Sequence, residues 1–242
     1  LFWSITRLVR SLIINEEQNL STMDVIVILG SGFVGALAYT FSDTFWFSAV
    51  EGEVYAFSSF LTALVFWMIL RWQDESDSVY GDRWIILIAY IIGLSIGVHL
   101  LNLLCIPAIV LVFYYQKYHA ISFKGVAAAI VISGLLIVFI LFVYIPGIAD
   151  MGGWFELLFV NVFGLPFHTG LIVFLALTFL VLVGAIYRFR KRMLHTSLWC
   201  LLMLTVGYTT YAVILIRANA NTPLNENAPD NIFTLTSYLN RE

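Results

Sequence analysis

The chain has 242 residues, of which 61% are hydrophobic and 11% charged, with a formal net charge of −3 and a mean hydropathy of +0.94. Soluble domains contain roughly 45–50% apolar and about 25% charged residues, so this composition excludes a soluble enzyme, a nucleic-acid-binding protein and a disordered chain. It predicts an all-α, polytopic integral membrane helical bundle. Because the chain opens inside an apolar segment that lacks signal-peptide features and stops in a polar one, we expect an internal fragment of a longer chain.

Apolar runs divide the chain into membrane-crossing segments, each needing about 20 residues. Residues 1–14 are predicted to be the last part of one span. The run 84–115 is too long for one helix and is interrupted near Gly97–Asn102, so two short helices joined at a turn are expected there. About seven full spans and part of one then make up residues 1–217: 1–14, 24–42, 54–72, the two halves of 84–115, 124–147, 169–187 and 195–216.

The distribution of positive charge supports this layout. When the loop near residues 15–22 is placed in the cytoplasm, only Arg217 and Arg241 among the twelve Lys and Arg residues fall on the outer side. Without the turn near His99, every later loop would change sides and the bias would disappear. The cytoplasmic set comprises Arg7, Arg10, Arg71, Arg83, Lys117, Lys124, Arg188, Arg190, Lys191 and Arg192.

The outer face is expected to carry residues 42–55, 97–102, 149–170 and the chain from 218 onward. Apolar residues recur with helical spacing near 152–164, which predicts an amphipathic helix lying in the outer membrane interface. Residues 218–242 are polar and rich in turn-forming residues, so they are interpreted as the start of an extracytoplasmic segment.

Two glycine patterns have a structural and a functional interpretation. Gly30, Gly32 and Gly35 have the GxGxxG spacing of a dinucleotide-binding loop, which requires a strand and a βαβ unit. No such unit is expected between membrane spans, so a small-residue face for close helix contact is strongly favoured. Gly93 and Gly97 form a GxxxG pattern with the same interpretation.

Three carboxylates lie near the outer end of the span 54–72, where ionisable groups are functional candidates. Asp43, Glu51 and Glu53 are candidates for substrate binding, for holding a divalent cation or for general-base chemistry. The alternative is that they are solvated acids at the membrane interface. On one helix Glu51 and Glu53 would diverge by about 200°, so at most one would point into a given cavity.

Three further polar residues are candidates on the same face. His99 and Asn102 lie three positions apart at the tip of the expected hairpin, although a lone histidine is more often structural. Arg217 is the single cation at an outer helix end, where a guanidinium suits phosphate recognition or, alternatively, interfacial anchoring. No metal-ligand spacing such as HExxH occurs, so whether a metal binds stays open.

Several stretches together resemble a known family: SDTFWFSAVEGEVYA, GLSIGVHLLNLL, WFELLFVNVFGLPF and SYLNRE. They are similar, over essentially the whole chain, to a bacterial membrane family labelled a domain of unknown function. That family is related to protein O-mannosyltransferases and includes an animal transmembrane O-mannosyltransferase. In this resemblance Glu53 matches a Glu-Val-aromatic-Ala pattern, and His99 and Asn102 match a histidine-containing hairpin, whereas Glu51 and Arg217 are assigned from the residues alone.

The resemblance implies a GT-C-type glycosyltransferase. It implies transfer of a hexose, with mannose as the first candidate, from a polyprenyl-phosphate donor to Ser or Thr of an acceptor protein at the outer membrane face. The family's acidic Asp-x-Gly-Glu-type motif, expected to supply the catalytic base, would precede residue 14 and is absent here. The fragment is therefore expected to be inactive alone. Its implied location is the bacterial inner membrane, with the site facing the periplasm.

Two other classes of function remain open from the residues. A transporter or flippase would place polar residues at the midplane and often shows an internal repeat, whereas here no repeat is found and the polar residues gather at one face. A membrane scaffold without chemistry would leave Glu53, His99 and Arg217 apart from one another. Membrane lipid, the lipid-linked sugar and an acceptor protein are the expected partners, and nucleic acid is not.

Overall fold

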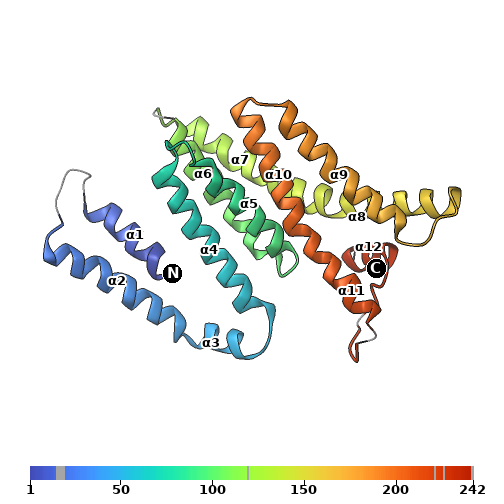
Figure 1. The fold of residues 1–242 in the computed structure, drawn as a ribbon. Coiled ribbons are helices and arrows are strands. Elements are labelled where there is room, and N and C mark those ends of the chain that lie inside the picture. The colour runs from blue at the N-terminus through green and yellow to red at the C-terminus, as the bar shows by residue number, and fades with distance from the viewer. Residues whose placement is uncertain (15–19, 119, 221, 226, 241–242) are drawn as a thin grey trace.

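The computed structural model describes the chain except for residues 15–19, 119, 221, 226, 241 and 242, and in that part every element is a helix (Figure 1). The predicted all-α fold is thus confirmed. The α-helices are α1 (Phe2–Ile13), α2 (Thr22–Thr40), α3 (Asp43–Val50), α4 (Val54–Glu75), α5 (Asp82–Ile96), α6 (Ile106–Lys117), α7 (Phe123–Phe139), α8 (Ile145–Leu157), α9 (Thr169–Arg188), α10 (Arg192–Tyr208), α11 (Ala212–Asn219) and α12 (Ile232–Asn240). Short 3-10 or π segments join some of them: η1 (Leu100–Cys105), η2 (Ile140–Tyr144), η3 (Leu158–Val162) and η4 (Thr209–Tyr211).

Six helical segments of the described chain are long and apolar enough to cross a membrane. The protein is therefore an integral membrane protein by the length and composition of its helices. Helix α1, with 12 residues, and α5, with 15, are shorter than these six. The six are Thr22–Thr40, Val54–Glu75, Leu100–Lys117, Phe123–Val162, Thr169–Arg188 and Arg192–Asn219.

The interruption of the apolar run 84–115 is confirmed. Helix α5 ends at Ile96, His99 has an extended backbone, and the chain then turns back as η1 and α6 (Figure 1). Cys105 at the end of η1 is buried and places its Sγ 4.0 Å from the carbonyl oxygen of Thr62 in α4. The other cysteine, Cys200, is partly buried in α10, and neither thiol forms a disulfide.

The glycine pattern in α2 serves helix packing, as the sequence predicts. A Cβ added to Gly32 would lie 2.4 Å from Thr6 Cγ2, and one added to Gly35 would lie 2.7 Å from Ile5 Cδ1. Helix α1 therefore packs directly on the small-residue face of α2. Gly30, the first glycine of the pattern, has no neighbour within 4 Å of such a Cβ and takes no part in this contact.

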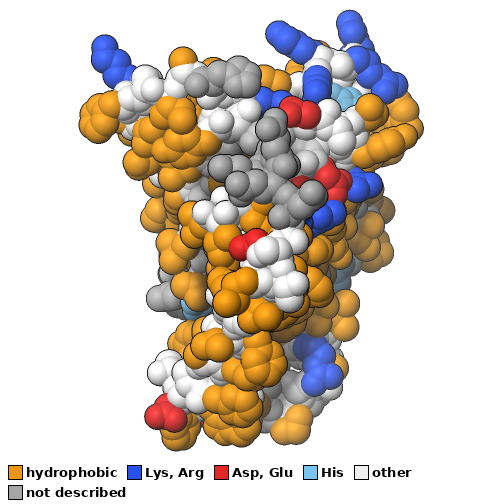
Figure 2. Space-filling model, turned by 90° about the vertical axis from the view of Figure 1, so that its left-hand side faces the viewer, with side chains coloured by type: hydrophobic (Ala, Val, Ile, Leu, Met, Phe, Trp, Pro, Cys, Tyr) orange, Lys and Arg blue, Asp and Glu red, His pale blue; other side chains and the backbone are white. Residues whose placement is uncertain are grey.

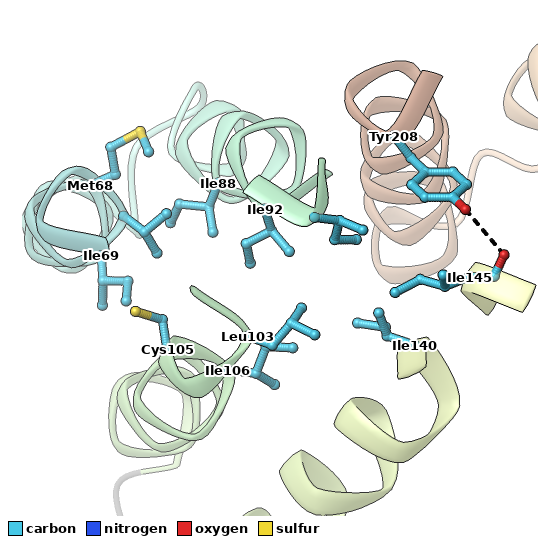
Figure 3. Close-up of a cluster of buried hydrophobic side chains, with 12 residues drawn as sticks. Met68, Ile69, Ile88, Ile92, Leu103, Cys105, Ile106, Ile140, Ile145 and Tyr208 are labelled. Atoms are coloured by element: carbon cyan, nitrogen blue, oxygen red, sulfur yellow. Dashed lines mark hydrogen bonds between the residues drawn. The ribbon is translucent and has the colours of Figure 1, made fainter. Parts of the chain in front are cut away.

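The main core lies between α4, α5, η1, α6 and α10. Figure 3 shows Ile92 of α5 directed toward Leu103 and Ile88 on the side of α4, near Met68 and Ile69. Tyr208 donates a hydrogen bond of 3.2 Å to the carbonyl oxygen of Ile145. Helices α5 and α10 meet at two glycines, because a Cβ on Gly93 would lie 2.3 Å from the Leu204 carbonyl oxygen and a Cβ on Gly207 would lie 2.5 Å from that of Tyr90. The GxxxG interpretation of Gly93 is therefore confirmed.

Residues 123–162 differ from the prediction. A span ending at 147, a connection and a separate helix near 152–164 were expected, but α7, η2, α8 and η3 form one continuous 40-residue helix, so the expected loop from 149 is wrong. Pro146 does not end the helix, because it directly follows the π turn η2, where the hydrogen-bonding pattern of the backbone changes and the missing N–H is accommodated. At 1.5 Å per residue the helix is about 60 Å long, twice the hydrocarbon thickness.

The tail also folds back onto this long helix. Ile232 and Leu235 of α12 are buried against Ala149 of α8, forming a second apolar cluster that the sequence analysis did not predict. The polar stretch before α12 is held by Asn219, whose side-chain amide donates to the carbonyl oxygens of Leu215 and Asp230 at 2.9 and 2.7 Å.

Lys and Arg side chains gather at one end of the molecule, the upper end in Figure 2. Three ion pairs join helices there: Arg7 of α1 binds Asp74 of α4, Arg83 of α5 binds Glu75 of α4 at 2.7 Å, and Arg192 of α10 binds Asp82 of α5, with Nε 3.1 Å from the carboxylate oxygen. The pKa of Asp82 is held below its ordinary value mainly by the hydrogen bond from Arg192, with a smaller contribution from that of Thr196.

This pKa shift predicts a pH dependence of stability. The Asp82 carboxylate stabilises the fold fully above its ordinary pKa, and this contribution disappears as the pH falls through the lowered value. Because the pair is partly exposed, we expect about 1 kcal/mol or less. Thermal unfolding in detergent at pH 7 and at pH 3 should therefore show a slightly smaller acid destabilisation in Asp82→Asn than in the wild type. An identical pH dependence in both would contradict this assignment.

Candidate functional site

The three candidate carboxylates lie around the break between α3 and α4. Asp43 is the first residue of α3, Glu51 follows its last turn and Glu53 precedes α4, with Gly52 between them at φ +73°. They do not share one helix, so the expected divergence of Glu51 and Glu53 by helical periodicity does not apply. Asp43 and Glu53 lie at helix N-termini, where negative charge is favourable.

All three carboxylates are exposed and make no side-chain hydrogen bond to the described residues. Nor does the described chain bring any three His, Cys, Asp or Glu side chains together as a metal-binding group. These three carboxylates alone therefore do not form a cation site, and a divalent cation would need further ligands. Cation binding stays a prediction. Glu53, the residue that precedes α4, has an exposed carboxylate that is available to a ligand.

His99 is brought against the start of α4. Its ring lies 5.4 Å from the ring of Tyr55, measured between centroids, and Tyr55 is two residues from Glu53. Nδ1 of His99 accepts a hydrogen bond of 3.1 Å from the Leu101 backbone N–H. In the neutral imidazole the proton is therefore on Nε2, which is left as a donor at the half-buried edge of the turn.

Asn102 was expected at the exposed tip of the hairpin as a candidate for substrate binding. In the structure its side chain is completely buried, at 0% exposure. One face of η1 packs on one face of α4, with His99 against Tyr55 at one end and Cys105 against Thr62 at the other. Asn102 is in the middle of this face. Its amide has no hydrogen-bond partner among the described residues, so it contributes a polar group to the inside of the helix contact.

Arg217 lies in the last turn of α11, an exposed helix end at which a cation is favourable. It makes no hydrogen bond or ion pair within the described residues. The helix follows η4, which touches the His99 turn, since a Cβ on Gly97 would lie 2.9 Å from Thr210 Oγ1. The structure therefore joins the His99 turn to Tyr55 and Thr210, but it brings neither Arg217 nor Asp43 into contact with them.

One polar residue was missed. Glu156 of α8 is 1% exposed, and its carboxylate accepts the backbone N–H of His168 and, at 2.9 Å, that of Leu171. These groups lie at the N-terminus of α9, where N–H groups lack intrahelical partners. Gly170 permits the contact, because a Cβ there would lie 2.4 Å from the Phe155 carbonyl oxygen. The sequence contained a signal for this residue, because Glu156 is an acid inside the apolar run WFELLF.

Comparison with known families matches residues 1–122 to the protein O-mannosyl-transferase TMEM260 N-terminal domain. The chain belongs to this family. The TMEM260 N-terminal domain covers α1 to α6 and half of the chain, whereas the resemblance was expected over almost its whole length. Comparisons with curated proteins and with solved structures found no match.

The matched region contains five of the six candidate residues; Arg217 and the missed Glu156 lie outside it. Membership of the TMEM260 N-terminal domain family supports a glycosyltransferase-like role, with a sugar donor and a protein acceptor in general terms. The five residues are Asp43, Glu51, Glu53, His99 and Asn102.

Proposed function

We propose that this chain forms the membrane part of a GT-C-type glycosyltransferase. The enzyme transfers a hexose, with mannose as the first candidate, from a polyprenyl-phosphate donor to Ser or Thr of a protein. The reaction would occur at the membrane face to which the α3–α4 break belongs. The observation that carries this proposal is the family match over residues 1–122. The free Glu53 carboxylate and the His99 turn at one end of that region support it.

In this proposal the described residues bind and orient the sugar. Glu53 accepts hydrogen bonds from sugar hydroxyls, and Nε2 of His99 donates one. The two residues are close in the fold because the His99 ring contacts Tyr55, which lies two residues after Glu53. Tyr55 also presents an aromatic ring, half exposed, beside the histidine. A general base takes the proton of the acceptor hydroxyl while its oxygen attacks the sugar C1 and the lipid phosphate leaves. In this proposal Arg217, at the exposed end of α11, attracts the lipid phosphate.

We expect Glu53→Gln to lower sugar transfer by roughly tenfold to a hundredfold, as the loss of a charged hydrogen bond to the substrate of about 1.5–3 kcal/mol implies. The assay uses the full-length protein in membranes, a radiolabelled polyprenyl-phosphate mannose donor and a peptide containing Ser and Thr. Transfer of label to the peptide is the readout.

The matched control is Asp77→Asn, which neutralises an exposed carboxylate at the opposite, cation-rich end. It should retain wild-type transfer. If Glu53→Gln is as active as Asp77→Asn, Glu53 has no role in the site. If the folded wild type transfers no label from several sugar donors, the glycosyltransferase proposal itself fails.

A further inference from the structure

A large cavity lies at the opposite end of α4 from the candidate site. Its volume is about 1310 Å³, it is partly open, and it is lined by α1, α2, the second half of α4 and the start of α5, together with Ile14 and Leu20. From Glu53 at the beginning of α4 to Asp74 in the cavity wall is about 30 Å along the helix. The cavity is therefore separate from the α3–α4 break.

Guanidinium groups dominate the polar wall of this cavity. Arg7 is paired with Asp74, while Arg71 and the adjacent Arg83 share the carboxylate of Glu75, at 2.6 and 2.7 Å. Each of these three arginines is held in place by a carboxylate. The pairs fix the guanidinium positions, and two carboxylates against three guanidiniums leave one positive charge uncompensated.

Arg10 adds a second positive charge that no described residue compensates. It lines the same cavity from the last turn of α1, is exposed, and makes no hydrogen bond or ion pair to any residue that the structure describes. A guanidinium with all its donors available binds a phosphate group through two parallel hydrogen bonds. Among the residues that the structure describes, the cavity wall thus has an excess of two positive charges, and Arg10 has its donors available for an anion.

The rest of the wall is apolar and aromatic. Trp67 and Trp84 meet edge to face with centroids 5.7 Å apart, Arg71 lies 5.6 Å above the Trp84 ring, and Trp3 stands on the α1 side. Tryptophan is enriched where a membrane meets water. A wall that combines arginines with such rings and with aliphatic side chains suits an amphiphile that has an anionic head and a hydrocarbon tail.

We propose that this cavity binds an anionic phospholipid of the surrounding bilayer, with the headgroup phosphate held by Arg10 beside the fixed guanidinium of Arg7. The lipid tail lies along the apolar wall toward α2. Basic pockets between membrane helices bind anionic headgroups in this way. The cation-rich end of the molecule, to which the cavity belongs, raises the local concentration of anionic lipid (Figure 2).

The test measures lipid binding to the full-length protein in phosphatidylcholine nanodiscs titrated with phosphatidylglycerol, with bound lipid counted by native mass spectrometry. The wild type should bind phosphatidylglycerol in preference to phosphatidylcholine. Arg10→Gln should weaken this binding about fivefold, the effect of one arginine near an anionic surface. Arg190→Gln removes an exposed arginine of the same end outside the cavity wall and should change binding less than twofold.

Three outcomes would overturn the proposal. Equal binding of the two lipids would show that the cavity does not select an anionic head. Equal losses in Arg10→Gln and Arg190→Gln would assign the preference to the general charge of this end. Displacement of phosphatidylglycerol by millimolar inorganic phosphate alone would make the ligand a soluble phosphate. Equal thermal unfolding of both variants and the wild type establishes that each is folded.

Discussion

Gly207→Ala is expected to destabilise the protein by about 3 kcal/mol, although it adds a single methyl group. The new Cβ would lie 2.5 Å from the Tyr90 carbonyl oxygen and 2.6 Å from the backbone nitrogen of Leu94 in α5, both of them backbone atoms that cannot rotate away. Helices α5 and α10 would have to separate along their whole contact, which opens the core around Ile92. Thermal unfolding in detergent and the monodisperse fraction on gel filtration measure the effect.

The control for this prediction is Gly184→Ala in α9. A Cβ at Gly184 meets nothing within 4 Å, and alanine is favoured over glycine inside a helix by up to about 1 kcal/mol. This variant should therefore be as stable as the wild type or slightly more stable. If Gly207→Ala behaved like Gly184→Ala, the close approach of α5 and α10 described above would be wrong.

The second large effect is expected from Glu156→Ala, with a loss of about 3 kcal/mol. The substitution removes the charged acceptor of two partly buried hydrogen bonds, those from the backbone N–H groups of His168 and Leu171, at the positive end of the α9 dipole. Glu156→Gln retains one acceptor oxygen but turns an NH2 group toward the other N–H, so it should lose about half as much.

Asp150→Ala is the matched control, because Asp150 is an exposed acid of the same helix. It should leave stability within about 0.5 kcal/mol of the wild type. Hydrogen exchange at the first turn of α9 gives a local readout, and it should accelerate in Glu156→Ala alone. Unchanged exchange in that variant would show that Glu156 does not hold the start of α9.

The elements that the sequence predicts well are those with a strong local signal. Long apolar runs give the spans, and the charge bias requires the reversal near His99, which the structure has at residues 97–99. The glycine spacing predicts close helix contact, although it cannot tell that Gly30 faces open space while Gly32 meets Thr6. That distinction depends on which side of α2 the neighbouring helix occupies.

The features that the sequence does not predict depend on tertiary contacts. Helix α3 is eight residues long and gives too little periodicity for recognition. The burial of Asn102 depends on where α4 packs, and the role of Glu156 depends on backbone groups twelve and fifteen residues later. Pro146 indicates a break by composition, but a preceding π turn lets the helix continue. In the candidate site, the residue types and their common end were predictable, and their distances were not.

The placement of the two thiols makes the membrane orientation measurable without a cysteine-free background. Cys105 and Cys200 both lie within helical segments that cross the apolar part of the molecule, so a water-soluble maleimide has poor access to either in intact membranes. A single cysteine introduced at the exposed Ser78, at the cation-rich end, or at Leu224, at the other, would then be the principal labelled site. Labelling from only one side of sealed vesicles would establish which compartment each end of the molecule faces.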